Sequence, residues 1–413
     1  MELYKKASEA EPPVANAFYY LGVVLEKQRE HRRSQALFKQ CLNLDQEHFG
    51  ASVHLATVLA NQSEMQKAAK YFRHALKIDP KSVTAHFGLA KILHSLADNL
   101  DTALEHYDFV LAQEPGHYKA LCQVGMLWLE KGELERAADA LKKCLKLAPK
   151  YVLGLVSMGN LLFETGHSKN AAKYHQQALK FNPHEVQALI GLGNALYDLN
   201  RPTEAIQYYR EALEQDDALA DVHYNLGNAL YLVEDTEGAI SHYKRAIHLN
   251  PQKPESYYNL GNALCIKSEF EKAIDCYRDA IALDKLNAPA FYNLGNAHYM
   301  LNQFPEAIAA YQAALKLNPD SAECHFNIAS AYNDQGEAEK AISHFKESLD
   351  YDATNPETHM NLALLLYARK EFGAALQSFE ECLRLNPALE GKVKEAMVIC
   401  QKNLEQEEAS SKE

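Results

Sequence analysis

The chain has 413 residues, a formal net charge of −13 and a pI of about 5.8. An acidic chain without a long basic run is poorly suited to nucleic acid, whose binding depends on neutralising phosphates, and to anionic membrane surfaces. The sequence shows no apolar stretch of membrane-spanning length and no signal segment. We therefore expect a cytoplasmic protein, with nuclear and cytoskeletal or ciliary locations left open.

One small residue recurs every 34 residues, with a single step of 35 between Ala90 and Gly125. The recurring residues are Gly22, Ala56, Ala90, Gly125, Gly159, Gly193, Gly227, Gly261, Gly295, Ala329 and Ala363. A fixed period in this range indicates one supersecondary unit that is copied and stacked. If this residue is position 8, full units begin at 15, 49, 83, 118, 152, 186, 220, 254, 288, 322 and 356.

Other positions of the unit also keep their residue type. Position 20 is alanine in most units, position 27 is small, position 24 is usually aromatic, and position 32 is often proline. Small residues let two helices approach closely, bulky residues fill the space between them, and proline ends a helix. Each unit is therefore predicted to be two antiparallel helices of about 14 residues, which makes the fold all-α.

Three consecutive segments carry the clearest motif: YNLGNALYLVEDTEGAISHYKRAIHLNP (224–251), YNLGNALCIKSEFEKAIDCYRDAIALD (258–284) and YNLGNAHYMLNQFPEAIAAYQAALKLNP (292–319). They resemble the tetratricopeptide repeat (TPR) family. The resemblance implies a right-handed α-solenoid superhelix of stacked antiparallel helix pairs, with eleven TPR units over residues 15–389.

The two ends of the chain differ from the repeats. Residues 1–14 match the second helix of a unit, so we expect a partial repeat there. Two explanations stay open: the chain is the C-terminal portion of a longer protein, or this helix is an N-terminal cap. At the other end, residues 390–408 are predicted to form a capping helix, which a repeat array needs, and residues 409–413 a tail.

Two asparagine columns and one tyrosine column lie on the side of the first helices that faces away from the stack. In this family that side lines the concave surface. Position 6 holds Asn225, Asn259, Asn293, Asn327 and Asn361; position 9 includes Asn194, Asn228, Asn262 and Asn296; position 5 includes Tyr224, Tyr258 and Tyr292. Asparagine is a mediocre helix former, so the two columns require an explanation.

A functional interpretation uses the amide groups. Each asparagine offers a donor and an acceptor, which can bind the backbone of an extended peptide while the aromatic residues supply apolar contact. This resembles the asparagine ladder in the repeat superhelix of O-linked N-acetylglucosamine transferase. Alternatively, the asparagines bond to adjacent helices and only stabilise the stack. We favour peptide binding for position 6 and leave both interpretations open for position 9.

The predicted ligand is an extended protein or peptide segment, neutral to basic and partly apolar. Position 13 changes from acidic residues to Leu232, Ile266 and Met300, which predicts an apolar strip, and position 2 predicts an acidic border. Clamping of an acidic C-terminal tail is disfavoured, because positions 5 and 6 contain no lysine or arginine.

No catalytic residue, metal site or cofactor is predicted. The sequence contains no HExxH, GxxxxGK[ST] or GxSxG motif, and its 18 histidines and 8 cysteines show no zinc-ligand spacing. We therefore expect a protein-interaction scaffold rather than an enzyme. Two alternatives stay open: a structural subunit of a large assembly, for example ciliary or cytoskeletal, and the targeting arm of a longer enzyme. Homo-oligomerisation is open as well.

Overall fold

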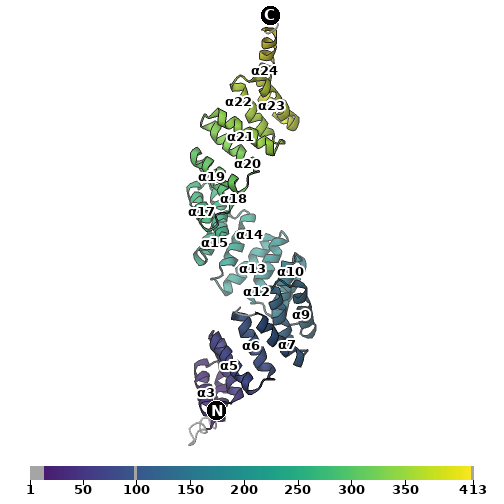
Figure 1. Cartoon of the computed structure of the whole chain (residues 1–413), viewed down its shortest axis with the longest axis vertical. Coiled ribbons are helices and arrows are strands. Elements are labelled where there is room, and N and C mark those ends of the chain that lie inside the picture. Colours follow the sequence, from purple (N-terminus) through teal and green to yellow (C-terminus); the bar gives the residue numbers. More distant parts are fainter. Residues whose placement is uncertain (1–13, 97–99, 411–413) are drawn as a thin grey trace. The chain divides into compact units, whose positions relative to one another are not determined.

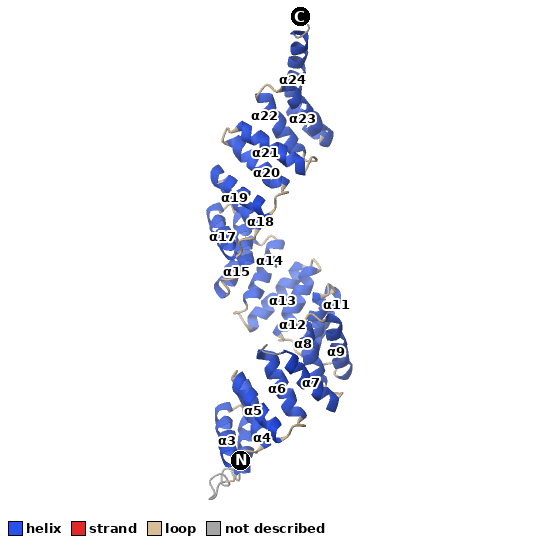
Figure 2. Cartoon of the chain, viewed as in Figure 1, coloured by secondary structure: helices blue, strands red, loops and turns tan. Residues whose placement is uncertain are grey.

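The computed structural model describes residues 14–96 and 100–410, with side chains described to residue 407. All regular structure in these ranges is helical (Figures 1 and 2). The chain divides into two compact units, Met1–Arg201 and Pro202–Glu413, here called unit 1 and unit 2. Among the helices of the described ranges, none combines the length and hydrophobicity that crossing a membrane would require.

Unit 1 consists of consecutive helix pairs, each also contacting the next helix along the chain, and ends with one further helix, Val186–Asp198, that packs on the preceding pair. Residues 1–13 lie outside the described residues, and with them almost all of the partial repeat expected at 1–14. The helices are α2 (Ala15–Lys27), α3 (His31–Leu44), α4 (Phe49–Asn61), α5 (Met65–Ile78), α6 (Val83–Leu96), α7 (Leu100–Gln113), α8 (Tyr118–Glu130), α9 (Leu134–Leu147), α10 (Val152–Glu164), α11 (Ser168–Phe181) and α12 (Val186–Asp198).

Unit 2 repeats the same arrangement. Its helices are α13 (Pro202–Gln215), α14 (Ala220–Leu232), α15 (Thr236–Leu249), α16 (Pro254–Ile266), α17 (Phe270–Leu283), α18 (Ala288–Met300), α19 (Phe304–Leu317), α20 (Ala322–Asp334), α21 (Ala338–Tyr351), α22 (Pro356–Ala368), α23 (Phe372–Leu385), the 3₁₀ turn η1 (Pro387–Leu389) and α24 (Glu390–Ser410). Helix α24 packs on α22 and α23 and buries Val393 and Cys400, and it extends two residues beyond the predicted end at 408.

Where the turn between the two helices of a pair lies within the described residues, a left-handed residue turns the chain. After α2, Arg29 has a φ of 62°, and its amide donates to the Glu26 carbonyl at 2.9 Å. The next amide, that of Glu30, donates to the Leu25 carbonyl at 2.9 Å. These two bonds form a Schellman motif, which satisfies carbonyls that the helix end would leave open. Among the described turns, glycine occupies this position only at Gly132, Gly166 and Gly336.

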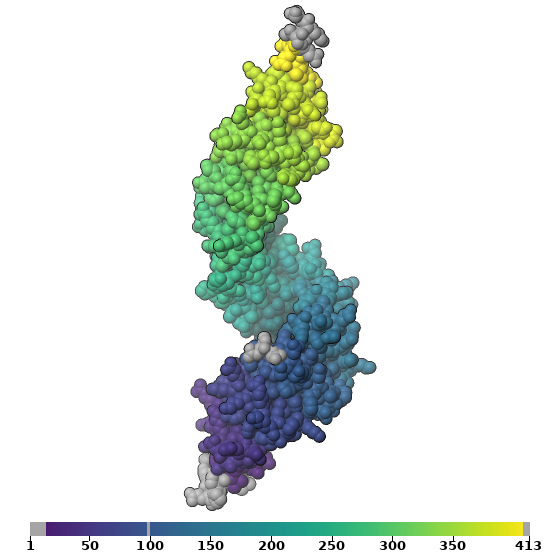
Figure 3. All heavy atoms as spheres, viewed as in Figure 1, coloured from purple at the N-terminus to yellow at the C-terminus, as the bar shows by residue number. Residues whose placement is uncertain are grey.

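Helix pairs approach closely because a small residue of the first helix faces a ring of the second. A Cβ atom built on Gly261 would lie 2.6 Å from Cε1 of Tyr277, and one on Gly295 would lie 2.5 Å from Cε1 of Tyr311. Both rings are about 1% exposed. In the space-filling view, side chains close the gaps between neighbouring helices within each unit (Figure 3). The small residue at position 8 therefore sets the distance between the paired helices.

Histidine replaces the aromatic ring in one pair of unit 1. His175 on α11 is fully buried, and neither ring nitrogen has a hydrogen-bond partner. A Cβ atom on Gly159 would lie 2.6 Å from its ring, and Gly191 of the following pair is also in contact with it. Burial lowers the pKa of His175 to about 4, because the imidazolium form would lose its hydration there.

Candidate functional site

The predicted asparagines of unit 2 lie on consecutive first helices and are half-buried. Asn228 is on α14, and Asn259 and Asn262 are on α16. Helix α18 carries Asn293 and Asn296, and α20 carries Asn327. Residues three apart on a helix are neighbours on one face, so α16 and α18 each present two amides side by side.

These asparagines form a hydrogen-bonded network with tyrosines. In its first rung, Asn259 Nδ2 donates to Asn228 Oδ1 at 2.9 Å and to the Tyr224 hydroxyl at 3.2 Å. The hydroxyl of Tyr243, on the second helix between them, donates to the same Asn228 Oδ1 at 2.9 Å. One rung therefore joins three helices of two consecutive pairs.

The same rung recurs twice along unit 2. Asn293 Nδ2 donates to Asn262 Oδ1 at 2.9 Å and to the Tyr258 hydroxyl at 3.2 Å, and the Tyr277 hydroxyl donates to Asn262 Oδ1 at 2.8 Å. In the third rung, Asn327 Nδ2 donates to Asn296 Oδ1 at 3.3 Å and to the Tyr292 hydroxyl at 3.1 Å. The Tyr311 hydroxyl donates to Asn296 Oδ1 at 2.8 Å. We call these three rungs the amide ladder.

The ladder uses part of each amide and leaves the rest accessible. The Nδ2 atom of Asn259 donates two hydrogen bonds, and so does that of Asn327. The Oδ1 atoms of these two residues accept no hydrogen bond within the described residues. In Asn228 and Asn262 it is Oδ1 that is used and Nδ2 that has no acceptor in those ranges. None of these open atoms is buried. Each of these four asparagines therefore leaves only part of its amide group open to a ligand.

The three predicted tyrosines are structural parts of the ladder as well as surface residues. Tyr224, Tyr258 and Tyr292 are half-buried, and each accepts a bond from an asparagine of the following pair. Each also packs against the buried tyrosine of its own pair, with ring centroids 5.8–6.2 Å apart. Burial raises the pKa of Tyr292, with a smaller effect from the carboxylate of Glu323. These rings can thus offer an edge to a ligand but are not free to rearrange around it.

Three predicted asparagines lie outside the amide ladder. Asn361 on α22 makes no hydrogen bond within the described residues, because the preceding pair has Ser330 and Phe326 where a rung needs asparagine and tyrosine. Asn225 on α14 and Asn194 on α12 are half-buried and are not free of partners. Asn194 belongs to unit 1, so the structure does not place it together with the others.

An exposed apolar strip lies beside the ladder, at position 13 of the first helices. Leu232, Ile266 and Met300 are 49%, 60% and 58% exposed. They are four residues beyond Asn228, Asn262 and Asn296, hence on the same helix face. The second helices of unit 2 have no such strip among their described residues. Their exposed large apolar residues, such as Leu283 and Tyr351, all lie at the last position of a helix.

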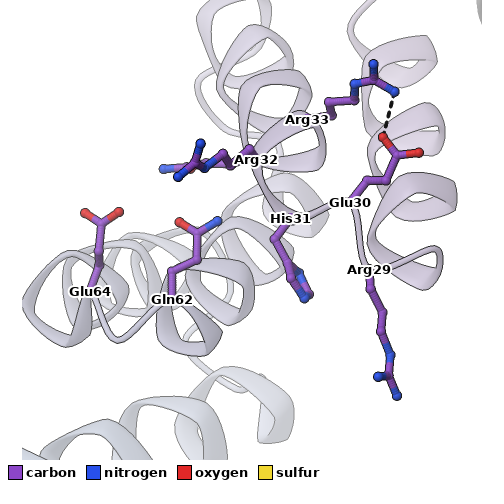
Figure 4. A pocket seen from close by; sticks show the side chains of 8 residues that line it. Arg29, Glu30, His31, Arg32, Arg33, Gln62 and Glu64 are labelled. Carbon is purple, nitrogen blue, oxygen red and sulfur yellow. Dashed lines mark hydrogen bonds and ion pairs between the residues drawn. The ribbon is translucent and has the colours of Figure 1, made fainter.

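Cavities lie in each unit. In unit 2, a cavity of about 220 Å³ adjoins the ladder and is lined by Pro289, Tyr292, Glu323 and Cys324, among others. In unit 1, a cavity of about 840 Å³ lies beside the turn after α2 (Figure 4). Its lining contains Arg29, Arg32, Arg33, Glu30 and Glu64, with Arg33 paired to Glu30 at 2.7 Å. No predicted site residue lines the cavity of unit 1.

Histidine pairs connect the two helices of three repeats. The Nδ1 atoms of His86 and His106 are 2.8 Å apart, those of His223 and His242 2.9 Å, and those of His325 and His344 3.2 Å. At the third pair, Glu347 joins the two rings. Among the described residues, this is the one group of three or more histidine, cysteine or acidic side chains whose ligand atoms are close enough for one metal ion.

Sequence reasoning missed both the ladder partners and this cluster. Tyr243, Tyr277 and Tyr311 were interpreted only as packing residues, although their hydroxyls orient the asparagines. A signal was present: asparagine at positions 6 and 9 occurs in the units that have tyrosine at positions 5 and 24. The histidine pairs were not predicted because their members are 19 or 20 residues apart and lie on different helices. That spacing matches none of the metal-binding motifs considered in the sequence.

Comparison with known proteins assigns the fold to a class and then to a family. The tetratricopeptide repeat model matches residues 19–83 and 97–152, in agreement with the TPR resemblance. Proteins of this class are protein-interaction scaffolds and are typically non-catalytic. The model described as "Cilia and flagella-associated protein 70 C-terminal domain" matches residues 184–399, more than half of the chain. The chain belongs to this family.

Solved structures with similarity to the chain include TPR proteins. MamA is 27% identical, with 40% of this chain and 96% of MamA covered and a TM-score of 0.38. YrrB, described as "a TPR protein with an unusual peptide-binding site", is 22% identical, with 48% and 99% covered and a TM-score of 0.42. A TPR protein from Parabacteroides merdae is 16% identical, with 60% and 98% covered and a TM-score of 0.48. A search of curated proteins finds no match.

Proposed function

We propose that the chain is a scaffold whose unit 2 binds an extended polypeptide segment along the face of its first helices. The observation that carries this proposal is the amide ladder with its unused groups. Asn259 and Asn327 at position 6 leave Oδ1 open, and Asn228 and Asn262 at position 9 leave their N–H groups open, beside the apolar strip. In the second rung, Asn293 Oδ1 already accepts a bond from Asn296 Nδ2 at 3.5 Å. An extended backbone offers the complementary N–H and C=O groups at regular intervals.

Two further features support this face. Consecutive first helices contact one another, as α14 does α16 and α16 does α18. Among the described residues, consecutive second helices contact one another less than these first helices do. A stack that is closer on the first-helix side curves towards that side, which favours a concave groove there. The ladder also holds its amides in place before a ligand arrives, which lowers the entropy cost of binding.

The proposed partner is neutral to basic and carries apolar side chains. Leu232, Ile266 and Met300 offer exposed apolar surface, and Glu255 and Glu323 are exposed carboxylates without an ion pair in the described residues. Glu323 also lines the cavity beside Tyr292, where a long basic side chain could place its apolar stem and its charge. Nucleic acid remains disfavoured as a partner because the chain is acidic.

Changing Asn228 and Asn262 to aspartate tests the ligand-binding role apart from the structural one. Aspartate keeps the oxygen that accepts from the tyrosine hydroxyl and from the next asparagine, but it replaces the open N–H group with an oxygen. With about 1 kcal/mol for each lost hydrogen bond, we expect a neutral peptide selected on the wild-type chain to bind about 30-fold more weakly. Titration calorimetry measures this affinity.

The matched control is Asn250→Asp with Asn302→Asp, which adds the same charge to unit 2 in turns between helices. Its affinity for the peptide should equal that of the wild type. Equal affinity of both double variants would mean that the ladder stabilises the stack and does not bind the ligand. Alanine at Asn259 and Asn293 is a less clean test, because it also removes the bonds between repeats.

A second candidate function is a structural subunit of a ciliary assembly. The specific observation in its favour is the family match over residues 184–399. Fluorescent tagging of the chain in a ciliated cell tests it, with enrichment along the axoneme as the expected result. A uniform cytoplasmic signal would argue against this candidate and leave the scaffold proposal untouched.

A further inference from the structure

The cluster of His325, His344 and Glu347 differs from the other histidine pairs of the chain. His325 lies in the first turns of α20, and His344 and Glu347 lie three residues apart on α21. In the two other pairs, Nε2 of the first histidine lies 3.1 Å from a backbone carbonyl, that of Pro80 or Asp217. Those rings can satisfy each other with a single proton between their Nδ1 atoms. The Asp217 carboxylate lies 3.4 Å from His223 but on its Nε2 atom, and among the described residues no carboxylate bridges the two rings of either pair.

At the third pair, three possible ligand atoms lie within 3.5 Å of one another. His325 Nδ1 lies 3.2 Å from His344 Nδ1 and 3.1 Å from Glu347 Oε2, and His344 Nδ1 lies 3.5 Å from the same oxygen. Ligand atoms around a tetrahedral zinc ion, at about 2.0–2.1 Å from the metal, are about 3.3 Å from each other. The three measured sides lie close to that value. A triangle of this size can therefore be capped by a single ion.

The surroundings hold the three side chains in these positions. The Tyr351 ring stacks on His325 with a centroid distance of 5.5 Å, and the Tyr332 ring stacks on His344 at 5.7 Å. Ser343 Oγ donates to Glu347 Oε1 at 3.2 Å, which leaves Oε2 directed at the histidines. Such outer hydrogen bonds are typical of carboxylates that bind metals.

We propose that His325, His344 and Glu347 form a binding site for a divalent transition-metal ion, of which zinc is the best match. Two imidazoles and one carboxylate favour zinc over magnesium or calcium, which prefer all-oxygen sites. The exposed fractions of the side chains rise from 10% for His325 to 22% for His344 and 42% for Glu347. The ion can thus enter from solvent, and a fourth position is left for water.

Zinc titration of the full chain, stripped of metal and without an affinity tag, tests the site. In competition with a chromophoric chelator, the wild type should bind one more equivalent of zinc than His344→Ala or Glu347→Gln. Glu347 is exposed enough for its glutamine variant to remain folded, and circular dichroism checks this. Ser343→Ala should weaken the site by about tenfold, because it removes the bond that orients the carboxylate.

The matched control is His242→Ala, which breaks the equivalent pair in the same unit and should leave this equivalent of zinc unchanged. Cobalt should give the visible bands of a four-coordinate ion without sulfur-to-metal charge transfer. Equal zinc binding by the wild type and Glu347→Gln would overturn the proposal. A sulfur-to-cobalt band would also overturn it, by assigning the ion to a cysteine.

Discussion

Acidification from pH 7 to pH 4 is expected to destabilise unit 1 by about 3 kcal/mol through His175 alone. Its pKa is lowered to about 4 in the folded chain, against an ordinary value of 6.5. Between these two values the unfolded chain binds a proton that the folded chain does not. The stability that depends on neutral His175 is therefore complete above pH 6.5 and is lost as the pH decreases towards 4. Below pH 4, this group no longer changes the stability.

The variant His175→Phe should lack this loss, because phenylalanine does not titrate. Phe38 and Phe72 occupy the same position of other repeats in unit 1, so the ring shape is compatible with the site. Urea unfolding of both proteins at several pH values isolates the contribution as a difference, since the other titrating groups are shared. An exposed control, His184→Gln, should follow the wild-type curve. Parallel curves for His175→Phe and the wild type would show that the folded chain accommodates the imidazolium.

Replacing Gly261 with leucine is expected to cost about 1–3 kcal/mol of stability. A Cβ atom at this position would already lie 2.6 Å from the ring of Tyr277, a residue that is only about 1% exposed. Overpacking of a core costs about 1–3 kcal/mol. The displaced ring also loses its bond to Asn262, worth about 1 kcal/mol, and the gain in helix propensity offsets about 1 kcal/mol of the total.

Hydrogen exchange is the appropriate measurement, because repeat arrays open locally and not always in one step. Exchange should accelerate most in α16 and α17. The control Gly391→Leu places the same side chain on α24, where nothing lies within 4 Å of the added Cβ atom. We expect that change to stay within about 0.5 kcal/mol of the wild type. Equal protection of α16 in the wild type and Gly261→Leu would contradict a role of this glycine in setting the helix spacing.

The period of the sequence was sufficient to predict the all-α fold, because each helix pair reuses the same packing solution. Small residues at position 8, such as Gly261, and aromatic residues at position 24, such as Tyr277, meet as the columns predict. The first helices begin at residues 15, 49, 83, 118, 152, 186, 220, 254, 288, 322 and 356, where the spacing places the unit starts.

The candidate site was less predictable, because it depends on which hydrogen bond each amide makes. Periodicity places Asn228 and Asn259 on one face, but it does not show that Asn259 reaches back to the preceding repeat. Nor does it show that a tyrosine from the second helix uses the Asn228 oxygen. The proposed metal-binding cluster of His325, His344 and Glu347 is still harder to predict from the sequence. His325 and His344 come together only because their two helices pair.

The most direct test of the proposed groove is photo-cross-linking of a bound peptide to defined faces of unit 2. A benzophenone amino acid at Met300 would lie in the exposed apolar strip, whereas the same residue at Gln312 would lie on the exposed side of α19. We predict that a peptide selected on the wild-type chain cross-links at position 300 and not at position 312. Cross-linking at position 312 with none at position 300 would contradict binding along the first helices.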